Sequence, residues 1–374
     1  MKNEYTYPIR ALINLNSFRD NIKIVRMIYP NAKIILPVKA NAYGHGDLII
    51  SKEAEKIGIE YLATARINEG IRLRENNIKL PIINLGAELD NNIDLAIKNN
   101  IELSVSSITN IIEIEKKAKH SDKIIALHLK IDTGMRRLGC NVDNSLDLAK
   151  YIDLSSNLKL KSIYTHFAKS DNDNNYTKEQ SDLFYKQLDI FKKNNISYDF
   201  YHLCNSGGII NLKEVEFDNN FAIRPGIMIY GYSPSSKSSN YELKPVMTLV
   251  SKVIHLKKVP KDSGVSYSHT YVTKKSAILA TIPLGYGDGF PRILSNKFSV
   301  KINGKSYKQV GTISMDLSVI EVDKNVKIGD DVYIFGDKNK CINDANDLAK
   351  LSDTISYEIT TALNNRVIRI AVKK

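Results

Sequence analysis

The sequence has no tryptophan, only three cysteines and no long apolar run. A membrane-spanning helix needs roughly 18 or more consecutive apolar residues, so we expect none. The cysteines, Cys140, Cys204 and Cys341, are odd in number and lack metal-ligand spacing, which predicts buried or incidental thiols without a disulfide framework or a metal site. The amino-terminal MKNEYTYPIR lacks the apolar core of a signal peptide, and a cytoplasmic location is predicted.

Charge of one sign is not concentrated in any part of the chain. Lysine and arginine number 53 against 41 acidic residues, for a net charge of +12. Basic residues alternate with acids, as in KEAEK and EIEKKAK, and no aromatic-basic repeat is present to stack nucleotide bases. Nucleic-acid binding is therefore not predicted as the main function.

Short apolar runs alternate with segments of helical period from residue 12 to about residue 230. Parallel strands need long crossovers, which helices usually supply. Eight such units predict an α/β fold, namely a (β/α)8 TIM barrel. A doubly wound open sheet is the alternative, because it has the same alternation of strands and helices. The predicted strands are 33–39, 61–65, 80–86, 101–105, 124–131, 160–166, 198–203 and 221–224. The predicted helices are 16–29, 47–57, 66–77, 88–99, 107–119, 143–156, 177–194 and a short one after Ser206.

A different pattern follows the Ser-rich and Gly-rich stretch at 231–240, which is typical of a linker. Apolar strand-like segments are joined by turn signals such as Asn303-Gly304, and one helix is expected at about 343–351. We predict a barrel domain at 1–235 and a mostly β carboxyl-terminal domain at 236–374. The predicted strand segments are 246–256, 276–284, 298–310, 318–322, 332–335 and 366–372.

Polar residues at the ends of the predicted barrel strands indicate chemistry, because barrel active sites form at the carboxyl ends of the strands. Lys39 follows the first apolar run, and an amine at the barrel mouth favours a lowered pKa or a covalent imine. Ser206 with its two glycines, and Gly226 with Ile227, lie where such barrels bind phosphate through backbone N–H groups. Each feature alone is more often an exposed lysine, a helix cap or a turn. Together they predict a phosphorylated aldehyde cofactor, pyridoxal 5′-phosphate.

Nine sequence blocks resemble, in order, the motifs of the alanine racemase family, and they cover nearly the whole chain. The first block, KIILPVKANAYGHG, and the eighth, GTISMDL, are the most specific. The nine blocks are 33–46, 128–139, 164–170, 205–208, 224–231, 264–272, 282–292, 311–317 and 357–367.

The resemblance implies a two-base racemase that interconverts L-alanine and D-alanine, with D-alanine supplied for cell-wall peptidoglycan. Lys39 would carry the cofactor aldimine and act as one base, and Tyr267 would be the other. Family members are head-to-tail homodimers, so Tyr267 would enter the barrel mouth of the second subunit.

The resemblance also implies the remaining site residues. Arg224 would face the pyridine nitrogen, and its permanent charge would suppress transamination. The phosphate-binding set would be Tyr43, Ser206, Gly226, Ile227 and Tyr357. His166 would link Arg224 toward Tyr267, and Arg137 would lie near the cofactor's phenolic oxygen and the substrate. Substrate-binding and access positions would be Met315, Asp316 and Tyr286, and Lys130 matches a position that is carbamylated in many members.

Some features leave alternatives open. Arg136 stands beside Arg137 and could compete with it for the cofactor, although the spacing favours Arg137. A serine or broad-specificity racemase of the same fold is the closest alternative, because one hydroxyl changes binding by only about 1–3 kcal/mol. A decarboxylase of basic amino acids would need an acidic residue at Arg224, and a cofactor-carrier protein would lack the β domain. The DNDNN segment at 171–175 departs from a calcium loop, since Tyr176 replaces its glycine.

Overall fold

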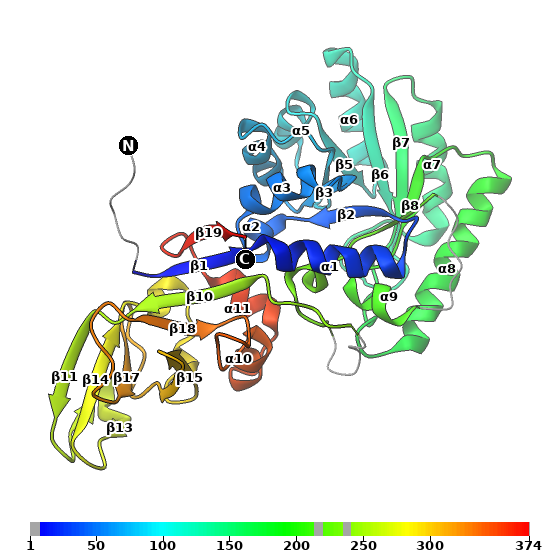
Figure 1. The fold of residues 1–374 in the computed structure, drawn as a ribbon. Coiled ribbons are helices and arrows are strands. Elements are labelled where there is room, and N and C mark those ends of the chain that lie inside the picture. Colours follow the sequence, from blue (N-terminus) through cyan, green and yellow to red (C-terminus); the bar gives the residue numbers. More distant parts are fainter. Residues whose placement is uncertain (1–7, 213–219, 235–240, 374) are drawn as a thin grey trace.

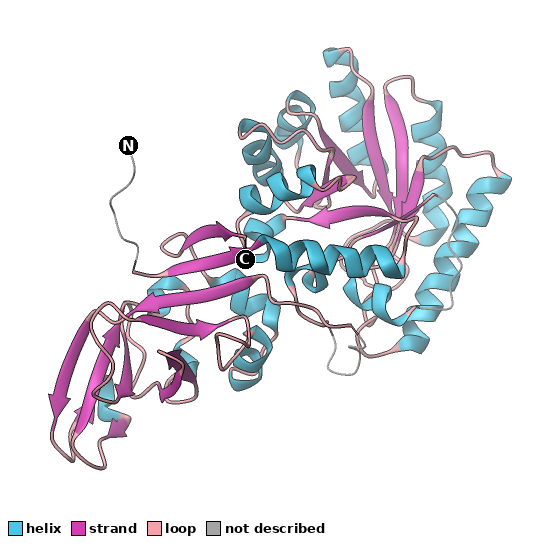
Figure 2. Cartoon of the chain, viewed as in Figure 1, coloured by secondary structure: helices cyan, strands magenta, loops and turns pink. Residues whose placement is uncertain are grey.

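The computed structural model describes residues 8–212, 220–234 and 241–373 (Figure 1). A rounded barrel unit occupies one end of the molecule, and a narrower unit rich in strands extends from it (Figure 2). Residues 1–7, which include most of the segment used to predict the absence of a signal peptide, lie outside the described residues, as do residues 235–240 of the predicted linker. Within the described ranges, no helix is both long and apolar enough to cross a membrane.

Eight parallel strands close into a barrel, which confirms the predicted fold and excludes the open sheet. The first barrel strand, β2, pairs with the last, β9, through Lys33 and Ala222. These strands are nearly continuous apolar runs because they are covered on both faces. The barrel strands are β2 (Lys33–Pro37), β3 (Tyr61–Thr64), β4 (Ile82–Asn84), β5 (Ile101–Val105), β6 (Ile125–Lys130), β7 (Leu158–Tyr164), β8 (Phe200–His202) and β9 (Phe221–Ile223).

Amphipathic helices surround the barrel at the predicted places, and several begin at a side-chain cap. Asn14 accepts hydrogen bonds from the N–H groups of Asn16 and Ser17, and Ser107 accepts one from Asn110. Asp173, in the former calcium-loop candidate, caps the helix that follows it. The helices are α1 (Leu15–Ile28), α3 (Asp47–Lys56), α4 (Ile67–Glu75), α5 (Asp90–Lys98), α6 (Ile108–Ser121), α7 (Ser145–Leu154), α8 (Asn174–Lys193) and α9 (Ser206–Asn211), with short 3-10 turns at Val142–Asn144 and Ile227–Tyr230.

The second unit consists mainly of three antiparallel or mixed sheets. Its largest sheet has the strand order β16-β15-β18-β10-β1-β19. The strands are β1 (Arg10–Asn14), β10 (Met247–Lys252), β11 (His255–Val259), β12 (Gly264–Val265), β13 (Tyr271–Val272), β14 (Ala277–Ile282), β15 (Ser299–Ile302), β16 (Lys305–Lys308), β17 (Ser318–Val322), β18 (Asp331–Phe335) and β19 (Ile368–Val372). The helices are α10 (Ala345–Leu351) and α11 (Ser356–Ala362), with 3-10 turns at Tyr267–His269, Tyr286–Asp288 and Arg292–Leu294.

Several parts of this unit differ from the sequence prediction. The predicted strand 246–256 is divided between β10 and β11, which belong to different sheets, and the short strands β12 and β13 were not expected. One helix was expected, whereas α11 follows α10 after a short turn. The prediction also missed β1, which comes from the amino-terminal part of the chain yet pairs with β10 and β19 (Figure 1). The Asn303-Gly304 turn is confirmed between β15 and β16, and both of its residues have positive φ. The domain boundary at 235/236 stays a prediction.

A left-handed turn, α2 (Lys39–Tyr43), follows strand β2 directly. Residues 40–43 all have φ between +50° and +55°, a conformation that costs roughly 1–2 kcal/mol for each L-residue. Surrounding contacts hold it in place. The Ala40 N–H donates to Glu69 Oε1 at 2.7 Å, and the Asn41 side chain accepts from the Asp47 N–H at 2.9 Å. The turn therefore presents Lys39 and Tyr43 from a backbone that an ordinary helix could not provide.

Gly44 ends this turn with φ +83° and allows α2 to touch α11. A Cβ atom at Gly44 would lie 1.9 Å from the Thr360 carbonyl oxygen, which is backbone and cannot rotate away. This close approach brings the carboxyl-terminal unit to the mouth of the barrel.

Gly44→Ala is expected to lower the free energy of unfolding by about 3 kcal/mol or more, because it combines positive φ with a backbone clash. Gly58→Ala is the matched control, since Gly58 has φ +73° but no atom lies within 4 Å of the place that a Cβ would take. It should cost only about 1 kcal/mol. Urea unfolding of both variants measures the difference, and equal losses would contradict the importance of the α2–α11 contact.

Candidate active site

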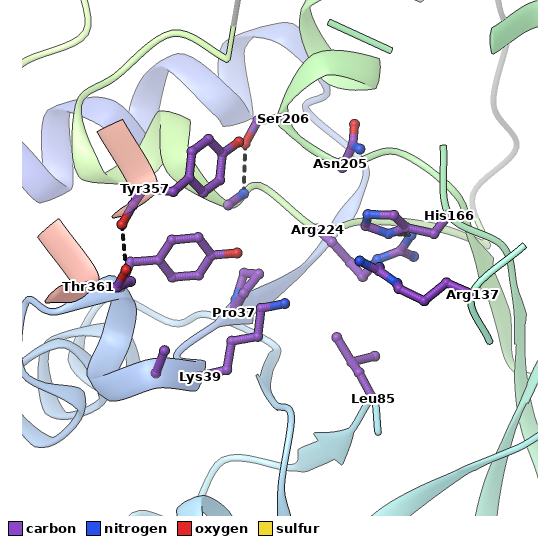
Figure 3. Close-up of a pocket in the computed structure, with 13 residues that line it drawn as sticks. Pro37, Lys39, Leu85, Arg137, His166, Asn205, Ser206, Arg224, Tyr357 and Thr361 are labelled. Atoms are coloured by element: carbon purple, nitrogen blue, oxygen red, sulfur yellow. Dashed lines mark hydrogen bonds between the residues drawn. The ribbon is translucent and has the colours of Figure 1, made fainter. Parts of the chain in front are cut away.

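A cavity of about 320 Å³ opens at the carboxyl ends of the barrel strands (Figure 3). Side chains from one strand end after another line it, and α11 closes one side. Figure 3 shows Ser206 and Tyr357 on one side, with Arg137, His166 and Arg224 on the other. The lining residues are Pro37, Lys39, Ala40, Tyr43, Leu85, Arg137, His166, Asn205, Ser206, Arg224, Gly226, Tyr357 and Thr361.

Lys39 extends its amine into the space between these two sides (Figure 3). Within the described residues, its side chain has no hydrogen-bond or ion-pair partner. Burial lowers the pKa of Lys39, the positive charges of Arg137 and Arg224 lower it further, and Glu69 opposes the shift. The lowered pKa increases the fraction of neutral amine, which is the nucleophilic form.

One side of the cavity is lined by groups that could bind an anion: Ser206, Gly226, Tyr43 and Tyr357. The Ser206 hydroxyl accepts hydrogen bonds from the N–H groups of Gly226 at 2.8 Å and Met228 at 3.3 Å. A Cβ at Gly226 would lie 3.1 Å from the Tyr43 hydroxyl, so glycine keeps this space open. Burial raises the pKa of Tyr43 to about 12 and also raises that of Tyr357, so both phenols stay protonated and can donate.

Arg224 is a buried cation without a carboxylate among its described hydrogen-bond partners. Its guanidinium donates to His202 Nδ1, to the Thr165 carbonyl at 2.6 Å and to the Leu203 carbonyl at 3.1 Å. His166 Nδ1 lies 3.4 Å from Nη2. Burial lowers the pKa of Arg224 to about 10, so the group still keeps its proton at neutral pH. The site therefore holds a fixed positive charge at its inner wall.

Arg137 lines the cavity, whereas Arg136, which has φ +55°, is not among the lining residues; both arginines are exposed. Lys130, at the end of β6, lines a smaller neighbouring pocket, and its amine lies 5.5 Å above the Tyr164 ring. Burial, then the charges of Arg224 and Arg137, lower the pKa of Lys130 to about 8. Ile227 is fully buried behind the cavity.

Tyr267, Tyr286, Met315 and Asp316 do not line this cavity. They lie on the carboxyl-terminal unit, where the Thr312 hydroxyl donates to the Tyr267 carbonyl and the Gly287 N–H donates to the Met315 carbonyl. Tyr267 is 69% exposed and Met315 54% exposed. Asp316 forms an ion pair with Arg366 at 2.8 Å. These four residues form a second, exposed cluster.

Sequence reasoning missed four contributors. Leu85, Asn205 and Thr361 line the cavity, and His202 contacts Arg224 inside the barrel. Leu85 and His202 lie at strand ends, so the rule that located Lys39 could have found them. Asn205 was visible as the residue before Ser206, and it caps α9 by accepting from the Gly208 N–H at 3.0 Å. The only sequence feature that could have indicated Thr361 is its position within the last motif, at 357–367.

One small cavity therefore contains an amine with a lowered pKa, a set of backbone N–H and phenol hydrogen-bond donors, and a buried cation. That combination suits a compact anionic ligand with a carbonyl group that can react with the amine.

Residues 13–234 match the family model for the alanine racemase N-terminal domain, and residues 246–371 match the model for the C-terminal domain. An alanine racemase of Treponema denticola is 41% identical over 374 residues, covering 97% of this chain and 98% of the relative. The solved alanine racemase of Clostridium difficile 630 has a TM-score of 0.92 at 35% identity, covering 99% of this chain and 97% of that one. The solved alanine racemase of a D-cycloserine-producing Streptomyces lavendulae has a TM-score of 0.92 at 30% identity, covering 99% and 98%.

Proposed function

The chain belongs to the alanine racemase family, a family of isomerases, and from that premise we propose that it interconverts L-alanine and D-alanine with the help of pyridoxal 5′-phosphate. The observation that carries the proposal is the convergence of Lys39, the Ser206–Gly226 cradle and Arg224 on one cavity. Each of the three has a counterpart in the cofactor: an aldehyde, a phosphate and a ring nitrogen.

The residues present fit that cofactor. The amine of Lys39 is free within the described residues, and Gly226 leaves open a cradle that a Cβ would narrow. Tyr43 and Tyr357 would donate to the phosphate beside Ser206, with Ile227 supplying backbone. Arg224 would face the ring nitrogen, with His166 next to it, and Arg137 would lie near the phenolic oxygen. When bound, the cofactor reacts with amino groups and withdraws electrons from the substrate Cα.

Racemisation requires that a proton leave one face of Cα and return on the other, so two groups must flank this carbon. Lys39 supplies the first group, since its lowered pKa allows it to accept and return a proton at Nζ. Tyr267 supplies the second through its hydroxyl. The Tyr267 of the same chain does not line the cavity, so the second group comes from another copy of the chain.

We propose a head-to-tail homodimer in which each subunit's exposed cluster covers the other's cavity. Six large hydrophobic side chains of the carboxyl-terminal unit are exposed to solvent: Tyr267, Val272, Tyr286, Ile293, Met315 and Leu317. Exposed apolar residues also occur on the barrel unit, but these six lie on the unit that carries Tyr267, and an exposed apolar surface beside a functional side chain supports an interface there. In the dimer, Met315, Asp316 and Tyr286 would bind substrate and line the access channel, while a carbamylated Lys130 would hold Arg137.

The proposed biological role is supply of D-alanine for peptidoglycan in the cytoplasm, where the three buried free cysteines would remain reduced. Serine racemisation at a reduced rate is the second candidate. The observation that favours it is the small difference between the two substrates, because a pocket that accepts a methyl group rejects an added hydroxyl only weakly.

Deuterium incorporation tests the function directly. The purified, cofactor-loaded protein is incubated in D₂O with L-alanine and with D-alanine, and Cα deuteration and optical inversion are followed for each. Both enantiomers should invert and exchange at Cα without loss of CO₂. The same assay with L-serine measures substrate breadth, and absence of inversion with either amino acid would refute the proposal.

Arg224→Glu is expected to increase transamination relative to racemisation by about tenfold or more, an effect of at least about 1.4 kcal/mol. Arg224 keeps its own proton and cannot protonate a ring nitrogen, whereas a carboxylic acid can, which strengthens electron withdrawal and favours proton return away from Cα. Formation of pyruvate per racemisation event measures the ratio. Arg136→Glu makes the same charge change outside the cavity and should leave the ratio unchanged; an equal rise in both variants would contradict the role of Arg224.

A further inference from the structure

A continuous chain of hydrogen bonds crosses the barrel interior from Arg224 to the opposite end of the barrel. Arg224 donates to His202 Nδ1 on β8, and His202 Nε2 lies 3.0 Å from the Ser162 hydroxyl on β7. The hydroxyl lies 2.6 Å from His128 Nδ1 on β6. His128 Nε2 lies 2.9 Å from Glu102 Oε2 on β5. Four neighbouring strands thus supply one link each, and we call His202, Ser162, His128 and Glu102 the barrel relay.

The two ends of the barrel relay determine the direction of every bond in it. A guanidinium can only donate, so His202 Nδ1 must accept, and a neutral His202 then carries its proton on Nε2. A carboxylate can only accept, so His128 must carry a proton on Nε2. The Ser162 hydroxyl accepts from His202 and donates to His128. Reversal of the link at either end would place two donors or two acceptors against each other.

Because the barrel relay is buried, a hydrogen bond in the wrong direction would be energetically costly. His202, Ser162 and His128 are fully buried, so no water is available to rescue a mismatched donor or acceptor. Burial and the nearby Arg224 charge lower the pKa of His202 well below its usual value, which keeps the ring neutral. Burial by itself raises the pKa of Glu102, but the hydrogen bonds from His128 and Lys161 outweigh it and lower the pKa. Glu102 is therefore anionic, with Lys161 Nζ at 2.5 Å from Oε1.

We propose that Ser162, His128 and Glu102 are positioning residues for racemisation, which act through His202 to hold the Arg224 guanidinium in the orientation that faces the cofactor ring. The proposal rests on the proposed function. Glu102 is the anchor, since it is the carboxylate that accepts at the far end. If His202 exchanged its proton from Nε2 to Nδ1, an N–H would face the N–H of Arg224, and the guanidinium would have to turn away.

Two substitutions break the barrel relay in different ways. Ser162→Ala removes its middle link. Glu102→Gln keeps the shape and the number of hydrogen-bonding atoms, but the amide can donate as well as accept, so His128 and His202 can reverse their protons. Ser104→Ala is the matched control. Ser104 is equally a buried barrel serine, and it accepts from the Tyr164 hydroxyl at 2.8 Å outside the barrel relay.

The experiment combines histidine ¹⁵N NMR with steady-state kinetics on the cofactor-loaded protein. The chain has seven histidines, so the ring signals can be assigned by single replacements. In the wild type, His128 and His202 should both carry the proton on Nε2. In Glu102→Gln a fraction should move to Nδ1, whereas in Ser162→Ala each ring keeps its outer partner and its tautomer; in both variants kcat should fall by about tenfold with KM nearly unchanged. Ser104→Ala should change neither the tautomers nor kcat by more than about twofold.

The outcomes separate this proposal from the proposed function. A wild type that does not racemise alanine refutes the function, and the positioning role fails with it. A wild type that racemises while Glu102→Gln retains its tautomers, or retains its kcat, overturns the barrel relay alone. If Ser162→Ala does not fold, Glu102→Gln decides the question, because it changes side-chain volume very little. A loss of kcat in Ser104→Ala equal to that in Ser162→Ala would show only a structural role.

Discussion

Replacement of Lys39 by alanine is expected to lower racemisation by about 10⁴-fold or more, because it removes the amine that we propose binds the cofactor covalently and serves as one of two proton-transfer groups. Lys39 lines the cavity, while the nearby Lys130 lines a separate pocket. The visible absorption band of the cofactor-loaded protein, and its loss on borohydride treatment, should both disappear in the variant.

Lys33→Ala is the control for that experiment. Lys33 begins the same strand, β2, at the opposite end of the barrel, where its amine lies 6.0 Å from the Phe200 ring. It should keep the absorption band and most of the activity. A Lys39→Ala protein that retains a borohydride-sensitive band would show that another amine binds the cofactor.

Tyr267→Phe is expected to lower kcat by roughly 10²–10⁴-fold in both directions, the usual contribution of a general acid or base. The change removes one oxygen and leaves the ring, so folding should be unaffected. Deuterium exchange should become one-sided, with washout persisting only for the enantiomer whose Cα proton faces Lys39. Tyr271→Phe is the matched control, because its hydroxyl is bound to Glu321 and the residue lies on β13, directly after the turn that carries Tyr267.

Mixing the two inactive proteins tests whether the active site is shared. Under conditions that allow subunits to exchange, a hybrid of Lys39→Ala and Tyr267→Phe chains would contain one site with both substitutions and one site with neither. Activity should therefore rise well above that of either protein alone. If no hybrid regains activity although exchange is demonstrated, Tyr267 acts within its own chain or not at all.

The barrel could be predicted closely because its strands are buried on both faces and so read as apolar runs. All eight lie within or beside the expected segments. The hydrogen-bonded partners of β1 come from residues more than 200 positions away, and no local pattern in RALIN indicates them. The helix α11 was missed for a related reason, since its packing against α2 depends on the absence of a side chain at Gly44.

The candidate site shows the same division. Lys39, Ser206 and Arg224 could be located by the rule that barrel chemistry lies at strand ends, and the cavity contains all three. Nothing local predicts the place of Tyr267, because its proposed role would require a second copy of the chain. The barrel relay was equally hidden, since inward-facing His128 and His202 look like ordinary strand residues until the closed barrel brings them to Ser162.

The pairing of β1 with β19 has a consequence for how the polypeptide can be divided and made. Ile368 follows Asn14 by more than 300 residues, yet the two strands lie side by side in register from Arg10 to Asn14. A fragment that begins after the linker would expose the bare edges of β10 and β19, and in a nascent chain the edge of β1 that pairs with β19 must stay open until Ile368–Val372 are made. Cutting at the apparent border between the two units should therefore yield aggregation-prone halves, because each half would carry an unpaired strand edge.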